Sequence, residues 1–171
     1  MGSKRTLPTV YLDTSVLSAL HYGGGSFQCI YRAMVTREWW QNERLHFRAY
    51  CSVIAEGELR QGKYDAQEKA VAEALRLPYL PLTSEVRELA HAYFEVGLVP
   101  RNQEGDALQL ALATANGVDY LMTWNHAHLA NAMVQARLLE TNQRQGRRSP
   151  WLVSPESIPK QAFGQVIRRR K

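Results

Sequence analysis

The sequence Pro8-Thr9-Val10-Tyr11-Leu12-Asp13-Thr14-Ser15 gives the strongest indication of how this chain folds. Its first six residues are rich in side chains that favour strands and end in an acid, which predicts a short buried strand. Either of the two hydroxyl residues that follow can cap a helix running to Leu20, and Gly23-Gly24-Gly25 ends that helix. The chain therefore opens with a strand and a helix, and a carboxylate stands at their junction.

Strands and helices alternate along the rest of the sequence. We expect strands at residues 45–51, 118–123 and 151–153, with a short strand or edge segment at 79–82, where proline removes a backbone donor. Helices are expected over residues 26–43, 52–62, 65–76, 84–95, 106–116 and 127–140, with a last one starting at Ser154. This alternation predicts an α/β protein with a mostly parallel central sheet covered on both faces. In such sheets, ligands bind beyond the carboxyl ends of the strands.

The helix of residues 26–43 carries apolar side chains at helical spacing, which predicts an amphipathic helix. These side chains are Phe27, Ile30, Tyr31, Met34 and Val35. Trp39 and Trp40 follow them, and we expect both to pack in the core or at a dimer interface.

Length and composition bound the class of protein. The 171 residues are enough for one domain with a proper core and barely enough for two. No apolar run approaches the ~20 residues that span a bilayer, and the first apolar run is too short for a signal peptide. We therefore expect a cytoplasmic protein with no membrane partner. Cys29 and Cys51 form no CxxC pair, which disfavours a zinc site of Cys/His type.

The net charge of +5 is unevenly distributed along the chain. Residues 1–140 carry 13 Lys/Arg and 15 Asp/Glu, a net charge of −2, whereas residues 141–171 carry 8 Lys/Arg and one acid, a net charge of +7. We therefore divide the chain into a domain of residues 1–155 and a basic C-terminal helix or tail of residues 156–171. Such a tail either contacts a polyanion or is only a solvated end.

Polar residues stand at four junctions between the predicted elements. Asp13 ends the first strand, and Glu58 lies in the helix of residues 52–62. Asp106 opens a later helix, and Asn125 follows the strand of residues 118–123. Carboxylates are rarely buried unless they are paired or bind a metal, so several that converge suggest a hard divalent cation with oxygen ligands. A metal-dependent nuclease is therefore the first hypothesis.

These four segments, in this order and spacing, resemble the PIN-domain family. They are Asp13-Thr14-Ser15, Glu58-Leu59-Arg60-Gln61-Gly62, Asp106-Ala107-Leu108 and Thr123-Trp124-Asn125, and the resemblance covers about residues 8–155. It implies a Rossmann-like three-layer α/β/α sandwich and cleavage of RNA that depends on Mg²⁺ or Mn²⁺. Many members are toxins of VapC-type toxin–antitoxin pairs, so the resemblance also implies a homodimer and an antitoxin protein as partner.

The resemblance assigns roles to individual residues. Asp13, Glu58 and Asp106 match the three acids that hold the metal, and Glu58 is preferred to Glu56 because the family's acid stands four residues before a glycine, here Gly62. The fourth catalytic position is usually Asp and is Asn125 here, which adds no charge. In support, Thr14 is expected to bond the first carboxylate or a water on the metal, and Thr123 stands at the fourth segment.

Three further side chains near these segments have two interpretations each. Arg60 is either a salt-bridge partner of Glu58 or a phosphate contact, and Trp124 either packs or stacks on bases. His126 is either structural or reaches RNA. Asp119, at the start of its strand, is expected to lie away from the site.

Other families with a strand-end acid fit less well. A phosphohydrolase of the haloacid-dehalogenase type needs a second acid two residues after Asp13, where this chain has Ser15. A receiver-like domain needs a neighbouring acid pair and a later lysine, and neither is evident. The remaining alternative is a catalytically weakened PIN fold that serves as an RNA-binding or protein-interaction module, and Asn125 is the residue that favours it.

Overall fold

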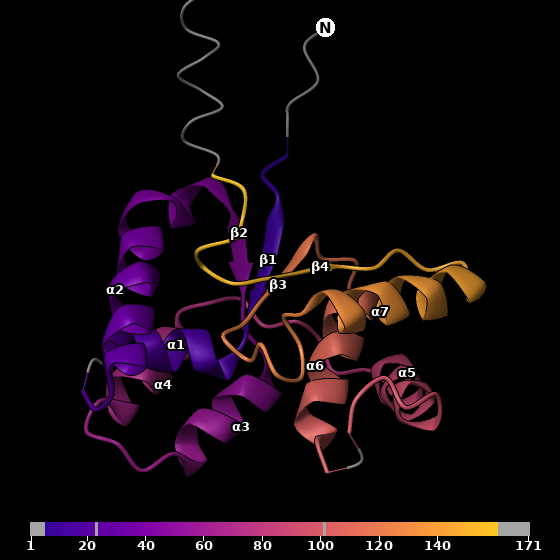
Figure 1. Cartoon of the computed structure of the whole chain (residues 1–171), viewed down its shortest axis with the longest axis horizontal. Coiled ribbons are helices and arrows are strands. Elements are labelled where there is room, and N and C mark those ends of the chain that lie inside the picture. Colours follow the sequence, from indigo (N-terminus) through magenta and orange to yellow (C-terminus); the bar gives the residue numbers. More distant parts are fainter. Residues whose placement is uncertain (1–5, 23, 101, 161–171) are drawn as a thin grey trace, which may run out of the picture.

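The structure, a computed structural model, describes residues 6–22, 24–100 and 102–160. Its sheet has the strand order β2-β1-β3-β4 (Figure 1). All neighbouring strands are parallel. The strands are β1 (Thr9–Leu12), β2 (Arg48–Tyr50), β3 (Tyr120–Met122) and β4 (Trp151–Val153). The predicted α/β class with a parallel sheet is therefore confirmed.

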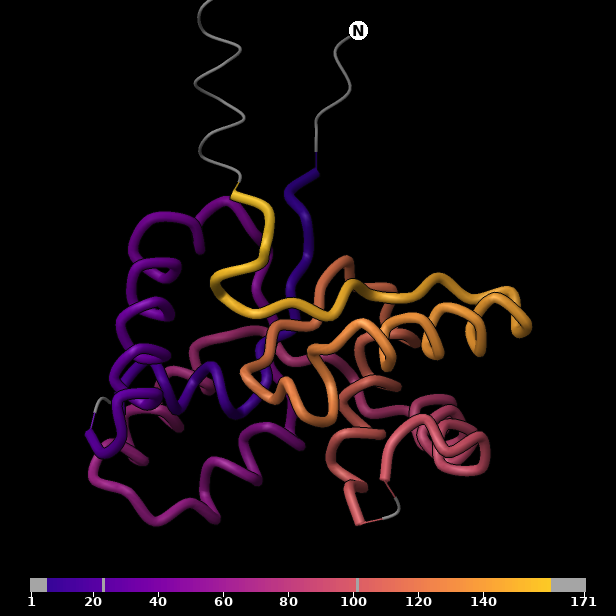
Figure 2. The backbone as a smooth tube through the Cα atoms, viewed as in Figure 1, coloured from indigo at the N-terminus to yellow at the C-terminus, as the bar shows by residue number. Residues whose placement is uncertain are grey.

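Helices cover both faces of this sheet. One layer holds α1 (Thr14–His21), α2 (Phe27–Asn42), α3 (Val53–Gln61) and α4 (Gln67–Leu75), and a 3₁₀ turn at Arg44–His46 leads into β2. The other holds α5 (Ser84–Glu95), α6 (Glu104–Ala115) and α7 (Ala132–Arg144). Figure 2 shows that the first layer comes from the N-terminal half of the chain and the second from the C-terminal half. The arrangement is the three-layer α/β/α sandwich expected from the sequence.

Side chains of the central strands alternate between the two layers. Val10 and Leu12 pack in the core beneath α1–α4, whereas Tyr11 between them packs in the core beneath α5–α7. In β3, Met122 packs in the core beneath α1–α4 and Leu121 packs in the core beneath α5–α7. All five side chains are fully buried, and burying each one contributes roughly 1.5–3 kcal/mol. This double burial fixes the place of β1 and β3 in the middle of the sheet.

Local signals place several helix starts. The Ser52 hydroxyl accepts the N–H of Ala55 and begins α3, and the Thr83 hydroxyl accepts the N–H of Val86 and begins α5. Three starts differ from the prediction: α4 begins at Gln67, α6 begins at Glu104, and α7 begins at Ala132, where the Asn131 side chain caps it. These caps satisfy N–H groups that have no partner within the helix.

Several large apolar side chains of α2 lie on its outer side. Phe27, Ile30 and Met34 are exposed by 85%, 49% and 61%, whereas the helix buries Ala33, Thr36 and Trp39. The helix of residues 26–43 is therefore present, but four of the five apolar side chains that predicted it are exposed, and only Val35 packs against the core. Trp39 itself packs in the core, as expected.

Three segments depart from regular structure. The predicted edge segment at 79–82 forms only a bridge between Cys51 and Tyr79. Residues 154–158 form a turn rather than the first turn of a helix, and Ile158 packs into the core. The remainder of the predicted basic tail, residues 161–171, lies outside the described residues. None of the described helices has the length and apolar character needed to cross a membrane.

Candidate active site

Asp13 stands where β1 passes into α1, at the carboxyl edge of the sheet. Its N–H donates to the carbonyl of Met122 at 3.1 Å, so the ends of β1 and β3 lie side by side. Its carboxylate does not cap α1 and instead accepts hydrogen bonds through Oδ2 from Ser15 Oγ at 2.7 Å and from Thr123 Oγ1. The side chain is 4% exposed, and these two hydroxyls fix its orientation.

Glu58 reaches the same edge from α3. Its Oε2 accepts hydrogen bonds from Thr14 Oγ1 at 2.5 Å and from Gln109 Nε2 at 3.3 Å. Glu58 is therefore tied to α1 and to α6. Burial raises the pKa of the Glu58 carboxyl, and the negative charges of Asp13 and Asp106 raise it further.

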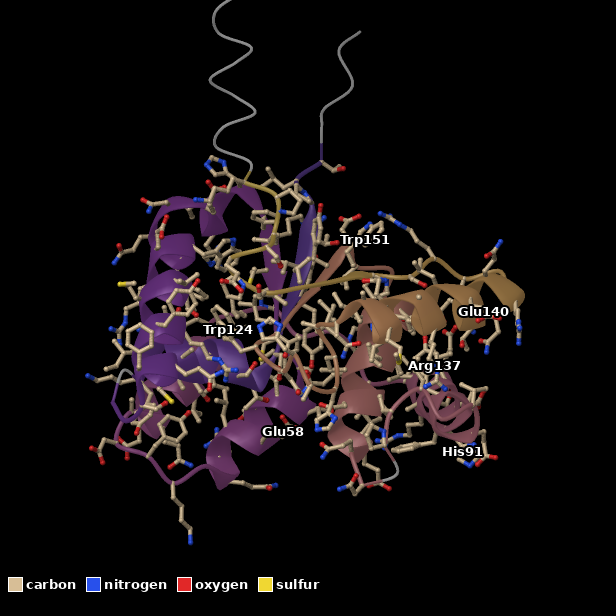
Figure 3. All side chains as sticks on the ribbon, viewed as in Figure 1. Glu58, His91, Trp124, Arg137, Glu140 and Trp151 are labelled. Carbon is tan, nitrogen blue, oxygen red and sulfur yellow. The ribbon has the colours of Figure 1, made fainter. Side chains whose placement is uncertain are left out.

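Gly105 leaves room for the Glu58 carboxylate against the first turn of α6. A Cβ on Gly105 would lie 2.5 Å from Glu58 Oε1, which is too close for any two such atoms. Figure 3 shows Glu58 on the part of α3 that lies toward α6. Together, Thr14, Gly105 and Gln109 form what we call the Glu58 seat.

Asp106 enters the site from the first turn of α6 and is 8% exposed. Burial raises its pKa to about 6, with a further contribution from the charge of Asp13, while His128 and a hydrogen bond from Asn125 act in the opposite direction. Asn125 Nδ2 lies 3.2 Å from each Asp106 oxygen. The Asn125 Oδ1 accepts the N–H of His128 at 3.1 Å, so the amide is held with its N–H groups toward Asp106.

These side chains line one surface pocket of about 470 Å³. Its walls are formed by Asp13, Thr14, Ser15, Glu58, Asn102, Gln103, Glu104, Gly105, Asp106, Gln109 and Asn125. Among the described residues, no Lys or Arg lines this pocket or forms an ion pair with Asp13, Glu58 or Asp106. Within the described part of the chain, the pocket therefore concentrates negative charge without a Lys or Arg to offset it.

The chemistry of these donors fits a hard divalent cation, which prefers carboxylate and amide oxygens. Two carboxylate oxygens, Asp13 Oδ1 and Glu58 Oε1, accept no hydrogen bond from the described residues. The acids are not gathered around one point, since no three His, Cys, Asp or Glu side chains in the described ranges are arranged to hold a metal ion.

The structure brings the four predicted catalytic residues together, but one supporting hydroxyl group, that of Thr14, contacts a different acid from the one expected. Asp13, Glu58, Asp106 and Asn125 line the same pocket. Thr123 bonds Asp13, but Thr14 bonds Glu58, and Ser15 makes the bond to Asp13 that was expected of Thr14. The reason is that Thr14 begins α1 on the side that packs against α3.

Other side chains named from the sequence do not line the pocket. Arg60 pairs with Glu56 at 2.6 Å rather than with Glu58, because residues four apart share a helix face. Glu56 also accepts the hydroxyl of Tyr79. Asp119 bonds the N–H of Thr9 at the opposite edge of the sheet. Trp124 is 2% exposed, so it is not available to stack on a base.

Sequence reasoning missed Gly105, Gln109 and the role of Ser15. Gln109 is 2% exposed, and its Oε1 has no hydrogen-bond partner among the described residues. The spacing of Gly105 and Gln109 by four residues places them on one side of α6 next to Asp106, and that signal was present in the sequence. Which acid they hold depends on α3, which no spacing within α6 reveals.

Comparison with known proteins gives a fold-level match. No protein-family model matches the sequence, and no curated protein matches it. Five chains of solved structures match, among them the crystal structure of Mycobacterium tuberculosis VapC20, described as a toxin that cleaves the sarcin–ricin loop. That match has a TM-score of 0.51 and 18% sequence identity and covers 75% of this chain and 94% of VapC20. The fold is therefore PIN-like.

Proposed function

We propose that this chain is an endoribonuclease that hydrolyses RNA phosphodiester bonds with Mg²⁺ or Mn²⁺ bound by Asp13, Glu58 and Asp106. The observation that carries the proposal is a pocket lined by three carboxylates from β1, α3 and α6 with no cationic partner among the described residues. The raised pKa values of Glu58 and Asp106 support it, because burial and the neighbouring acids disfavour the charged carboxylates and a bound cation favours them.

A separate set of hydrogen-bond donors orients each acid. Ser15 and Thr123 orient Asp13, Thr14 and Gln109 orient Glu58, and Asn125 orients Asp106. When bound, the cation lowers the pKa of a water molecule and stabilises charge that develops on the scissile phosphate. Asn125 adds no charge of its own. Because it stands where the family usually has Asp, we expect the binding of a second metal ion to be weakened most.

The test is cleavage of a single-stranded RNA by the purified protein. We expect cleavage with Mn²⁺, none with EDTA, and a large loss for Asp13→Asn with Mn²⁺. A circular RNA distinguishes an endonuclease from an exonuclease, because a circle has no end to degrade. Equal cleavage in all three conditions contradicts the proposal.

A second candidate is a PIN-fold module that binds RNA or protein without cleaving. Two observations favour it: the uncharged Asn125 at the fourth position and the absence of a gathered metal cluster among the described residues. Mn²⁺ binding by calorimetry together with no cleavage of any RNA would select this candidate.

We further propose a toxin role in the cytoplasm, with a co-encoded antitoxin as partner and a homodimer as the working form. The fold-level likeness to the VapC20 toxin supports the toxin role. Expression of the wild-type chain should arrest growth while Asp13→Asn does not, and co-expression of the neighbouring gene product should relieve the arrest. Arrest by both variants contradicts a toxin role that depends on cleavage.

A further inference from the structure

Arg32 of α2 lies over the ring of Trp124, with its Cζ 5.7 Å from the ring centre. The ring is fixed in place because Trp124 Nε1 donates to Thr36 Oγ1 at 2.9 Å, and Thr36 Oγ1 donates to the Arg32 carbonyl at 2.7 Å. The guanidinium thus rests on a buried, hydrogen-bonded platform. An arginine held in this way loses little freedom when it binds a phosphate.

Trp124 connects this arginine to the acidic pocket. Its backbone N–H donates to Ser15 Oγ at 2.9 Å, and the next residue, Asn125, lines the pocket. Figure 3 shows Trp124 between α2 and the sheet. The Arg32 guanidinium therefore contacts the residue that directly precedes Asn125, a residue of the pocket wall.

Two accessible rings stand beside the same platform. Tyr31, 38% exposed, has its ring centre 6.4 Å from that of Trp124, and the exposed His126 has its ring centre 5.9 Å away. Tyr31 donates its hydroxyl to Glu156 at 2.6 Å, which places one carboxylate at the outer edge. Arg32 forms no ion pair with Glu156 or any other described acid.

We propose that Tyr31, Arg32 and His126, which we call the Arg32 surface, bind the RNA next to the bond that is cut. Arg32 contacts a backbone phosphate, and the two rings contact a neighbouring base. This inference rests on the proposed nuclease function. Its physical basis is that a pocket of three acids repels the RNA backbone, so attraction for the strand has to come from cations outside the pocket.

The position of Arg32 sets it apart from two other arginines over aromatic rings. Arg44 lies over Trp40 at 5.3 Å, and Arg48 lies over Tyr50 at 5.9 Å. Arg44 precedes β2 and Arg48 begins it, so both lie at the amino edge of the sheet, opposite the pocket. Arg44 has the same kind of contact as Arg32 and a similar half-buried setting, so it is a matched control.

The test measures binding of a fluorescent single-stranded RNA in EDTA, at several salt concentrations, by anisotropy. We expect Arg32→Ala to reduce the slope of log K against log [salt] by about 0.7, the value for one phosphate contact on a single strand. Arg44→Ala should leave the slope at the wild-type value. Tyr31→Leu should weaken binding without changing the slope, because stacking releases no counterion. Circular dichroism and thermal unfolding confirm that each variant is folded.

The outcomes separate this inference from the nuclease proposal. Cleavage of RNA by the wild type with Mn²⁺, together with equal slopes for wild type and Arg32→Ala, overturns the Arg32 surface and leaves the nuclease standing. Equal losses of slope for Arg32→Ala and Arg44→Ala also overturn it, because the effect is then one of net charge. Absence of RNA binding in EDTA overturns the Arg32 surface, and the nuclease proposal is then judged by cleavage with Mn²⁺ alone.

Discussion

At the scale of single residues, the pocket is defined by an imbalance of charge. Asp13, Glu58 and Asp106 share it without a lysine or arginine among the described residues, and hydroxyl and amide groups supply the hydrogen bonds instead. Neutral donors orient a carboxylate but do not cancel its charge. The metal-free protein therefore holds these groups at a cost in free energy, and that cost depends on pH.

The pH dependence of stability should reveal this cost at Asp106. Its pKa is about 6 in the folded chain, against 3.8 ordinarily, so the folded state holds the proton more tightly. Stability from this group is therefore fully present below about pH 4 and is lost as the pH rises to about 6, by up to roughly 3 kcal/mol. We expect urea unfolding in EDTA to show this loss for the wild type and a flatter profile for Asp106→Asn. Parallel profiles contradict the assignment.

Asn125→Asp should make the metal-free protein less stable and more responsive to metal. The change replaces a donor to both Asp106 oxygens by a like charge, while the oxygen that accepts the His128 N–H is kept. We expect a loss of about 1–3 kcal/mol in EDTA at neutral pH. Thermal unfolding with Mn²⁺ should recover most of it, whereas Asn125→Ala should gain nothing beyond the wild-type response. A loss that Mn²⁺ leaves unchanged contradicts the metal assignment.

At the scale of elements, α6 does more than present Asp106. Gly105 and Gln109, four residues apart, hold the carboxylate that α3 supplies, so the start of α6 positions two of the three acids. The helices α3 and α6 come from different layers of the sandwich and meet only at this edge. The geometry of the site therefore depends on how closely these two helices approach each other.

Gly105→Ala should separate activity from stability. The added Cβ displaces only the flexible end of Glu58, and alanine favours a helix over glycine by up to about 1 kcal/mol, so the folded chain should be as stable as the wild type or more so. Mn²⁺ affinity and RNA cleavage should nevertheless fall by about 10- to 100-fold. Gly57→Ala in α3 meets no atom within 4 Å and should leave both unchanged. Equal activity of the two variants removes the Glu58 seat from the proposed mechanism.

At the scale of the whole molecule, α2 presents two different surfaces. Arg32 lies next to the buried side of the helix, whereas Phe27, Ile30 and Met34, which we call the apolar stripe, lie on its outer side. With about 3.6 residues per turn, Arg32 itself points away from these three side chains, whereas Tyr31 lies beside them, four residues after Phe27 and three before Met34. We expect the stripe to bind a second copy of the chain, so Tyr31 lies at the border between that interface and the Arg32 surface.

Ile30→Glu should convert the proposed homodimer into a monomer. Ile30 is 49% exposed in the single chain, so the change should alter the free energy of unfolding of a monomer by no more than about 0.5 kcal/mol. Light scattering after size-exclusion chromatography gives the mass directly. Met133→Glu, at another exposed apolar side chain on α7, should remain a dimer. A wild-type protein that is monomeric, or an Ile30→Glu protein that is dimeric, contradicts the apolar stripe as the interface.

The sequence by itself determined the order of strands and helices, the parallel sheet, and the gathering of Asp13 and Asn125. It could do so because strand and helix periods are local, and because carboxyl ends of neighbouring parallel strands must meet at one edge. The tertiary structure alone decided which hydroxyl holds which acid, the Glu58 seat, and the outward face of α2. Thr14 and Glu58 are 44 residues apart, and Thr123 and Asp13 are 110 apart. Contacts over such separations depend on how whole elements are rotated against one another, and no spacing within one element encodes that rotation.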